Sequence, residues 1–296
     1  MNKIKVCTFA LMTANPLPIP RNLIDVENVI AAKNPTLLKL IPRFIIRYLK
    51  HILHQDQIND YIYRNRDKHG LDFVAVILQE FGVTVKITAP AISPLQGADV
   101  ASLDPRCIIA ANHPLGGLDG LALMQAIGEI FPDVVFPVND ILMNIPGLKP
   151  LFIPINKHGT NAENIRIIDR TFASDKTILY FPAGLVSRKQ RDGGIRDLEW
   201  KKTFITKARK YHRDIIPATI AGQNSNFFYN LANWRKRLGI SANIEMLYLV
   251  DEMMRQKDQT IHITLGQPIP WISLDGSKTD AEWANHVKSL VYRAND

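Results

Sequence analysis

Apolar positions change their spacing along the chain, and the change separates a helical first part from an alternating second part. Up to residue 82, apolar residues lie at helical spacing. This predicts helices over roughly 22–33, 36–56 and 58–82. Short apolar runs then predict strands at 83–89, 107–111, 134–138, 151–155, 177–181, 215–220, 244–249 and 261–265. Segments between and after these runs predict helices at 118–130, 161–174, 198–212 and 279–293.

Strands that alternate with helices are typical of α/β domains. We therefore expect an α/β fold with a mixed, mostly parallel sheet flanked by helices. A Pro-rich stretch at 16–20 predicts an extended linker. Residues 1–60 are expected to form an N-terminal segment with two membrane-docking helices, and residues 61–296 the α/β domain. No apolar run approaches the roughly 18 residues that a membrane-spanning helix needs.

The predicted helix over 36–56 carries basic and apolar side chains on opposite sides. At about 100° per residue, one side gathers the cations Lys39, Arg43, Arg47 and Lys50. A wide apolar face opposite a Lys/Arg-rich face is typical of a helix at a membrane interface. A surface helix packed on a protein core shows a similar pattern. Pro42 predicts a kink. We expect the four cations to bind an anionic membrane surface.

Composition and charge narrow the function classes. The chain has 296 residues, 46% hydrophobic and 22% charged, with 36 Lys+Arg against 28 Asp+Glu and a net charge of +8. This excludes a disordered tail, a collagen and a disulfide scaffold. The basic balance suits an anionic partner: nucleic acid, an anionic membrane or an acidic carrier protein. Cys7 and Cys107 are the only cysteines. They form no zinc motif, so we expect no metal and a reducing compartment.

Nucleic acid is the competing explanation for the basic charge. The stretches 201–202 and 234–237 would suit phosphate contacts. However, Trp200, Phe204 and Tyr211 near the first stretch lie at helical spacing, which favours core packing. The chain carries no zinc-finger, RRM or homeodomain motif. We therefore expect no nucleic-acid partner.

The candidate chemistry lies in residues 110–120, Ala-Ala-Asn-His-Pro-Leu-Gly-Gly-Leu-Asp-Gly, between a predicted strand and a predicted helix. The chain has no nucleophile elbow, P-loop, zinc-protease or dinucleotide motif. Asp119 is able to accept a hydrogen bond from one imidazole nitrogen of His113, which leaves the other nitrogen as a general base. Glycines in the turn allow a ligand to approach the backbone. The alternative is a structural histidine in a tight strand–helix turn.

Four blocks in this order resemble the glycerolipid acyltransferases typified by 1-acyl-glycerol-3-phosphate acyltransferase. Asn112-His113 with Asp119 resembles the catalytic block of that family. The other three resemble its acceptor-binding block, its Phe-Pro-Glu-Gly-Thr-Arg-Ser-Arg block and its late Val-Pro block, and lie at 151–157, 181–188 and 216–218. The paired N-terminal helices also resemble the family's membrane-binding element.

Departures from the family pattern point to a particular branch. Five residues separate His113 from Asp119 where the family has four, so the turn must bulge and a direct contact stays open. Ala183, Leu185 and Val186 replace the usual Glu, Thr and first Arg. The variant blocks resemble a bacterial haemolysin-like branch that includes O-acyltransferases making glycine and ornithine lipids. Their acceptor is an N-(3-hydroxyacyl) amino acid, whose carboxylate needs fewer cations than a phosphate.

The resemblance implies acyl transfer from acyl carrier protein or acyl-CoA, as co-substrate, to a lyso-lipid hydroxyl, with no bound cofactor. His113 would be the base and Asp119 would orient it. The residues expected to bind substrate are Asn112, Gly116, Gly117, Lys157, Gly184, Ser187, Arg188 and Lys189. Backbone N–H groups near Gly184 would stabilise the oxyanion. The enzyme would lie on the cytoplasmic face of the inner membrane as a peripheral protein.

Three alternatives remain open at this point. One is a 1-acyl-glycerol-3-phosphate acyltransferase of phospholipid synthesis. Another is a thioesterase, in which water replaces the acceptor at the same base. The third is a non-catalytic module that binds a membrane or a carrier protein.

Overall fold

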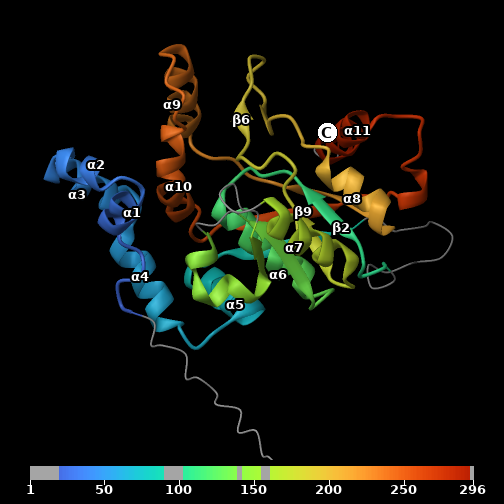
Figure 1. Ribbon diagram of the computed structural model, residues 1–296, viewed down its shortest axis with the longest axis horizontal. Helices are drawn as coiled ribbons and strands as arrows, with labels where there is room; N and C mark the ends of the chain where they lie inside the picture. Colours follow the sequence, from blue (N-terminus) through green and yellow to red (C-terminus); the bar gives the residue numbers. More distant parts are fainter. Residues whose placement is uncertain (1–19, 90–102, 139–141, 155–160, 294–296) are drawn as a thin grey trace, which may run out of the picture.

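A twisted seven-stranded sheet forms the centre of the protein (Figure 1). A computed structural model describes residues 20–89, 103–138, 142–154 and 161–293. The strand order is β1-β9-β8-β2-β5-β3-β4, and every neighbouring pair is parallel except β8 and β9. The strands are β1 (Thr84–Thr88), β2 (Ile108–Ala111), β3 (Val134–Val138), β4 (Phe152–Pro154), β5 (Thr177–Tyr180), β8 (Ile215–Ile220) and β9 (Thr260–Leu265). The predicted mixed, mostly parallel α/β sheet is confirmed.

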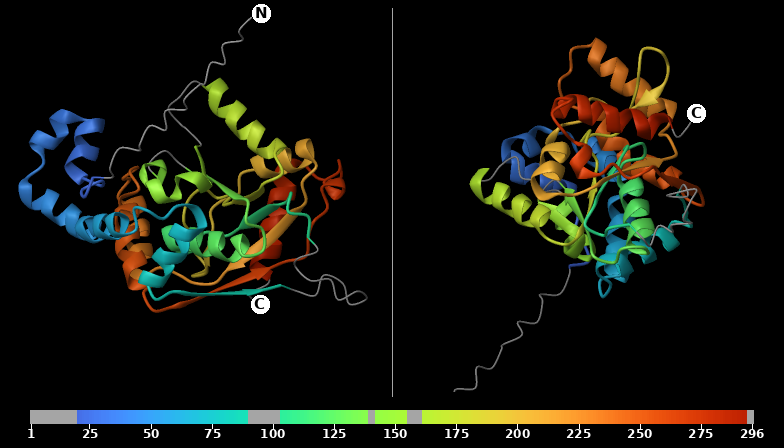
Figure 2. Two further views of the ribbon diagram at one scale, coloured as in Figure 1. Left: turned by 90° about the horizontal axis from the view of Figure 1, so that it is seen from below. Right: turned by 90° about the vertical axis from the view of Figure 1, so that its right-hand side faces the viewer.

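Helices cover both faces of the sheet (Figure 2). One face packs against α5 (Gly70–Glu80) and α6 (Gly117–Gly128). The other packs against α7 (Asn161–Ala173), α8 (Thr203–Tyr211) and α11 (Asp280–Arg293). β2 and β8 are buried along their whole length, as expected for apolar central strands covered on both faces.

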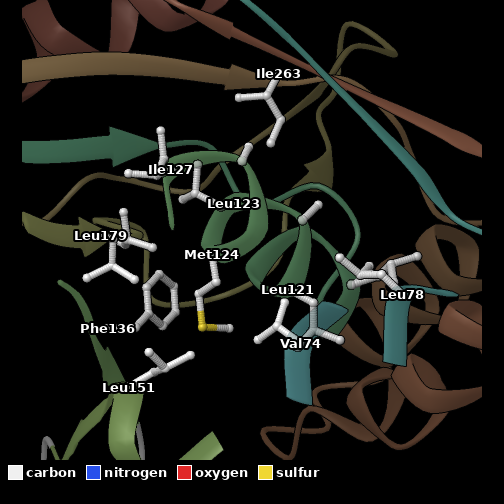
Figure 3. Close-up of a cluster of buried hydrophobic side chains, with 14 of the residues drawn as sticks. Val74, Leu78, Leu121, Leu123, Met124, Ile127, Phe136, Leu151, Leu179 and Ile263 are labelled. Atoms are coloured by element: carbon white, nitrogen blue, oxygen red, sulfur yellow. The ribbon is translucent and has the colours of Figure 1, made fainter. Parts of the chain in front are cut away.

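The larger hydrophobic core lies between the sheet and the α5–α6 layer (Figure 3). Leu123 and Ile127 lie one turn apart on α6 and are fully buried. Val74 and Leu78 repeat this spacing on α5. Helical spacing of four residues places each pair on one face, so both helices present a continuous apolar stripe to the sheet. This core anchors α6, whose first turn carries Asp119.

The predicted long N-terminal helices are shorter than expected. The segment 36–56 divides into α2 (Pro35–Leu40) and α3 (Arg43–Ile52), after α1 (Val26–Lys33). Pro42 does more than kink the helix: it occupies the N-cap of α3, and Ile41 before it is extended. A proline lacks the N–H that a helix interior needs and disfavours a helical residue before it.

The segment 58–82 also divides, into α4 (Gln55–Arg64) and α5. His54 separates α3 from α4 in a left-handed conformation with φ of 45°. α4 spans the domain boundary that the sequence placed after residue 60. Tyr61 and Ile62 at its end are buried in the larger core. Residues 1–19, with Cys7 and most of the Pro-rich linker, lie outside the described residues.

The strand predicted at 244–249 is wrong. This segment forms the 3-10 helix η4 (Ile244–Tyr248) and the start of α10 (Leu249–Arg255). Its mostly apolar run matches the pattern of a buried strand, but Glu245 within it is charged, fully buried and paired with Arg188 and Arg235. The sequence also left α9 (Asn226–Arg237) unpredicted, together with the hairpin of β6 (Arg188–Lys189) and β7 (Ile195–Arg196).

The described part of the chain contains no helix with both the length and the apolar content required to cross a bilayer.

Candidate active site

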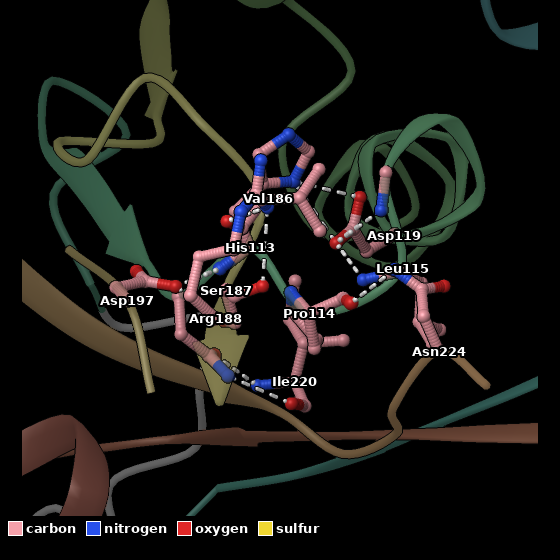
Figure 4. Close-up of polar contacts among 12 residues, drawn as sticks. His113, Pro114, Leu115, Asp119, Val186, Ser187, Arg188, Asp197, Ile220 and Asn224 are labelled. Atoms are coloured by element: carbon pink, nitrogen blue, oxygen red, sulfur yellow. Dashed lines mark hydrogen bonds and ion pairs between the residues drawn. The ribbon is translucent and has the colours of Figure 1, made fainter. Parts of the chain in front are cut away.

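His113 and Asp119 face each other across the turn that joins β2 to α6 (Figure 4). The Nδ1 atom of His113 lies 3.0 Å from each carboxylate oxygen of Asp119. The five-residue spacing therefore preserves the direct contact that the sequence had left open.

The Asp119 carboxylate holds the longer turn, which has five residues between His113 and Asp119, through two backbone hydrogen bonds. Asp119 Oδ2 accepts hydrogen bonds from the backbone N–H groups of Leu115 at 2.8 Å and Gly116 at 3.2 Å. Gly116 adopts a φ of 90°, a conformation that glycine enters at little cost. Asp119 is fully buried in the first turn of α6, where the helix dipole favours a negative charge. The bulged turn thus orients the carboxylate toward His113.

This geometry prepares His113 to act as a base. A carboxylate only accepts hydrogen bonds, so Nδ1 carries the proton and Nε2 holds the free lone pair. Among the described residues, Nε2 has no hydrogen-bond partner. The imidazole stacks on Phe181 with ring centroids 4.2 Å apart, and its side chain is 17% exposed. One ring nitrogen is held, and the other is available to a substrate.

Asp197 supports the same turn from the opposite side and was missed from sequence. Its buried carboxylate accepts from the His113 backbone N–H at 3.2 Å, the Ser187 hydroxyl at 2.5 Å and the Trp200 indole N–H at 2.8 Å. Ser187 also donates its backbone N–H to the carbonyl of His113 at 2.7 Å. Asp197 lies outside every recognised block, so no local motif identifies it.

Other predicted residues of the turn make structural contacts. Both amide atoms of Asn112 bond the backbone of Ile220, the oxygen at 2.7 Å and the nitrogen at 2.9 Å. Gly117 lies under α10, and a Cβ there would come within 3.5 Å of the sulfur of Met253. These contacts tie the turn to β8 and α10. Whether Asn112, Gly116 or Gly117 also touches substrate stays a prediction.

The segment after β5 is mostly buried. Ala183 packs into the core beneath α8 and Val186 into a small cluster with Phe228. These side chains occupy apolar space, which explains why the polar residues of the family pattern are absent. Gly184 donates its own N–H to the carbonyl of Phe181 at 3.0 Å, and an oxyanion donor among the N–H groups near it stays a prediction.

Arg188 is buried and paired. Its guanidinium donates to Glu245 at 2.9 Å and to the carbonyl of Val186 at 2.6 Å. Arg235 bonds the other oxygen of Glu245 at 2.5 Å. Burial raises the pKa of the Glu245 carboxyl, but the hydrogen bond from Arg235 and the charges of both arginines outweigh it and lower the pKa. Arg188 thus holds the segment in place.

The remaining predicted cations have different surroundings. Lys189 is half-buried on β6, and Lys157 lies outside the described residues. Arg235, considered as a phosphate contact, is instead part of the buried ion cluster. The cation beside the Gly184 turn is the exposed Lys201, whose Nζ would lie 3.6 Å from a Cβ on Gly184. Its backbone N–H donates to Pro182 at 3.0 Å, which fixes its place next to the turn.

A cavity of about 440 Å³ lies beside the turn. Its walls include Pro114, Ser187 and Tyr292, together with the backbone after β8. His113 is not part of its lining, so the cavity flanks the His113–Asp119 pair rather than enclosing it. The described residues contain no group of three or more His, Cys, Asp or Glu side chains that would hold a metal ion.

The chain is similar over most of its length to known acyltransferases. A family model described as acyltransferase matches residues 28–295. A lyso-glycine lipid O-acyltransferase of Phocaeicola vulgatus is 46% identical over 273 residues, which cover 92% of this chain and 95% of the relative. Another of Bacteroides thetaiotaomicron is 45% identical over 273 residues, covering 92% and 97%. The solved 1-acyl-sn-glycerophosphate acyltransferase PlsC of Thermotoga maritima aligns with a TM-score of 0.49 at 15% identity, covering 90% of this chain and 91% of that one.

Proposed function

The chain belongs to this acyltransferase family, and from that premise we propose that it acylates the hydroxyl of a lyso-glycine lipid, an N-(3-hydroxyacyl)glycine. The observation that carries the proposal is the contact of His113 with Asp119 at 3.0 Å, within a chain 46% identical to a lyso-glycine lipid O-acyltransferase. A histidine that only stabilised the turn would not need to keep Nε2 unpaired at a partly exposed position.

The reaction uses His113 as a general base. Nε2 takes the proton of the acceptor hydroxyl while its oxygen attacks the thioester carbonyl carbon. The tetrahedral intermediate then collapses, the carbon–sulfur bond breaks, and the departing thiolate takes the proton back from the imidazolium. Asp119 holds the tautomer and stabilises the imidazolium. The products are an ester and a free thiol, and His113 returns to its starting state.

Lys201 is our candidate for the acceptor carboxylate, because Arg188 already pairs with Glu245. A lysine ammonium is a point charge, adequate for a single carboxylate and less suited than arginine to the fork of a phosphate. Lys201 lies beside the turn at Gly184. That turn follows Phe181, whose ring stacks on His113, and this position supports the role.

The donor is a thioester of acyl carrier protein or of coenzyme A. The net charge of +8 is compatible with either, since both are anionic. Parallel assays with the same acyl chain on the two carriers would distinguish them through kcat/KM.

The membrane surface is the proposed place of the reaction, on the cytoplasmic face of the inner membrane. α2 and α3 expose Leu40, Phe44 and Tyr48 next to Lys39, Arg43 and Arg47. Lys50, the fourth predicted cation, pairs with Glu27 at 2.5 Å. Each free cation near an anionic surface contributes about 1 kcal/mol to binding. Reversing Arg43 and Arg47 to Glu should weaken binding to anionic vesicles more than reversing Lys50.

The decisive experiment offers purified protein one thioester donor and two competing acceptors, N-(3-hydroxyacyl)glycine and lyso-phosphatidate. Mass spectrometry should find the acylated glycine lipid as the main product, formed roughly 10²–10⁴-fold more slowly with His113→Ala. Preferential acylation of lyso-phosphatidate would replace this proposal with glycerophospholipid synthesis. Free fatty acid as the main product would indicate a thioesterase, and no turnover of any donor would indicate a binding module.

A further inference from the structure

α9 and η4 form a helical hairpin that projects from the body of the protein. It stands at the same end of the molecule as α1–α3, as Figures 1 and 2 both show. The last two residues of α9 and the turn that follows it, 236–243 together, are all exposed. We call Trp234, Lys236, Arg237, Leu238 and Ile240 the α9 tip. None of these residues takes part in the catalytic geometry.

The α9 tip exposes large apolar side chains. Trp234 is 65% exposed, Leu238 66% and Ile240 39%. Scattered apolar residues are normal on protein surfaces, but three within seven positions at the end of one hairpin form a patch. Lys236 and Arg237 flank them, and no acidic residue occurs anywhere from Ser225 to Asn243. The tip is therefore apolar and cationic together.

The α9 tip is also held rigidly from beneath. The buried guanidinium of Arg235 donates to the carbonyl of Ile240 at 3.1 Å, to the side chain of Asn243 and to Glu245. Arg188 bonds the same carboxylate, so the support reaches the buried segment after β5. A buried ion cluster thus fixes a turn whose apolar side chains remain uncovered. A shape maintained in this way is suited to an external partner.

We propose that the α9 tip inserts into the interfacial region of an anionic membrane and forms a second lipid contact apart from α2–α3. Tryptophan prefers the headgroup level of a bilayer, and leucine and isoleucine gain by leaving water. Lys236 and Arg237 meet the anionic headgroups. Two separated contacts fix the orientation of a peripheral protein, which one contact alone leaves free to rotate.

The position of the hairpin supports a lipid surface as its partner. The hydroxyls of Tyr48 on α3 and Tyr248 on η4 lie 2.7 Å apart, and His54 pairs with Asp251 of α10 at 3.0 Å. The hairpin is therefore tied to the helices that expose Phe44 and Tyr48 themselves. An acidic carrier protein would be recognised through cations, whereas this tip presents more apolar side chains than charges.

Tryptophan fluorescence tests the insertion directly. Trp200 and Trp283 are buried, and Trp271 stacks on His212, so Trp234 is the most exposed of the four. Vesicles of phosphatidylglycerol and phosphatidylethanolamine with brominated acyl chains should quench the wild type. Trp234→Phe keeps the apolar surface and should remove most of the quenching while binding persists. Equal quenching in both proteins would overturn the proposal.

A second measurement separates the α9 tip from general surface effects. Leu238→Ser with Ile240→Ser should weaken binding to the same vesicles roughly tenfold or more. Ile272→Ser changes a 72% exposed isoleucine of η5 (Trp271–Ser273) and is the matched control, expected to bind normally. The proposal fails if the double variant binds as tightly as this control. It also fails if that variant loses acyl carrier protein binding but keeps vesicle binding.

An activity assay adds a third test, and the two binding measurements do not depend on its outcome. The double variant should lose turnover of an acceptor embedded in vesicles and keep turnover of the same acceptor dispersed in detergent. Vesicle binding itself needs no catalysis, so failure of the proposed acyl transfer would leave the quenching result intact. Equal loss of both activities would indicate damage to the catalytic body and contradict the proposal.

Discussion

Two segments meet at the carboxyl edge of the sheet, the turn 112–119 after β2 and the segment 181–189 after β5. In the turn, the His113 ring remains partly open beside a fully buried carboxylate. In the second segment, the side chains of Ala183, Val186 and Arg188 are all buried. Both segments carry motif blocks, but the first leaves the His113 ring partly exposed, whereas the second is largely buried.

The difference shows how the surrounding residues hold the His113 side chain in position. His113 is bonded through its ring to Asp119, through its N–H to Asp197 and through its carbonyl to Ser187. Each partner is itself buried and bonded. A general base works only when it is held at the right distance and in the right tautomer, and these three contacts hold His113 in place. Removing a group from each segment should therefore have different consequences.

The largest expected effect is on turnover. His113→Ala should lower kcat by roughly 10²–10⁴-fold, the usual loss for a general base. Its ring is at the edge of the turn, so the unfolding midpoint should stay near that of the wild type. Single-turnover rates and a thermal unfolding curve measure the two quantities. Near-normal turnover would remove His113 from the mechanism.

Removing the carboxylate that pairs with Arg188 should lower the free energy of unfolding by an amount comparable to the rise in activation free energy that His113→Ala causes. Glu245→Ala leaves Arg188 and Arg235 buried without their shared carboxylate, which should cost about 3–5 kcal/mol. Urea unfolding measures it, with the exposed Glu199→Ala as a control expected to change little. A stable Glu245→Ala protein with a raised KM for the acceptor would return Arg188 to substrate binding.

Low pH should weaken the ion pairs of Glu245 and so lower the free energy of unfolding. The pKa of Glu245 is lowered in the folded protein from its ordinary 4.5, so the unfolded chain binds this proton more readily. The stabilisation is complete above about pH 4.5 and is lost as the pH falls through the folded value. Unfolding free energies between about pH 6 and about pH 3 should fall more steeply for wild type than for Glu245→Gln. Parallel curves would show that another group carries the acid sensitivity.

The smallest effect concerns the exposed cation beside the second segment. Lys201→Ala should raise KM for the glycine-lipid acceptor about fivefold, the equivalent of about 1 kcal/mol for a partly solvated ion pair. The donor KM and the stability should not change. Lys202→Ala, the exposed neighbour, is the matched control. If both variants behave alike, Lys201 has no special part in acceptor binding.

Much of the molecule could be predicted from local patterns. The runs 134–138 and 215–220 coincide with β3 and β8, because apolar β-branched residues buried on both faces leave little choice. Residue types in the strand–helix turn made His113 and Asp119 candidates, but their direct contact was left open by the five-residue spacing and came from the structure. The prediction of a strand at 244–249 was wrong, and the burial of Glu245 inside this segment depends on arginines from other parts of the chain, which a local pattern does not contain.

What the sequence determined by itself is a set of local preferences: most strands of the central sheet, the helix carrying Asp119 and an interruption of helical geometry at Pro42. Only the tertiary structure decided which charges are buried. Arg188 and Arg237 are the same residue type, yet one is buried against Glu245 and the other is exposed at the α9 tip. Their difference arises from contacts across 57 positions of sequence. Burial is a property of the packed chain, and it turns one arginine into a structural support and leaves the other available to a partner.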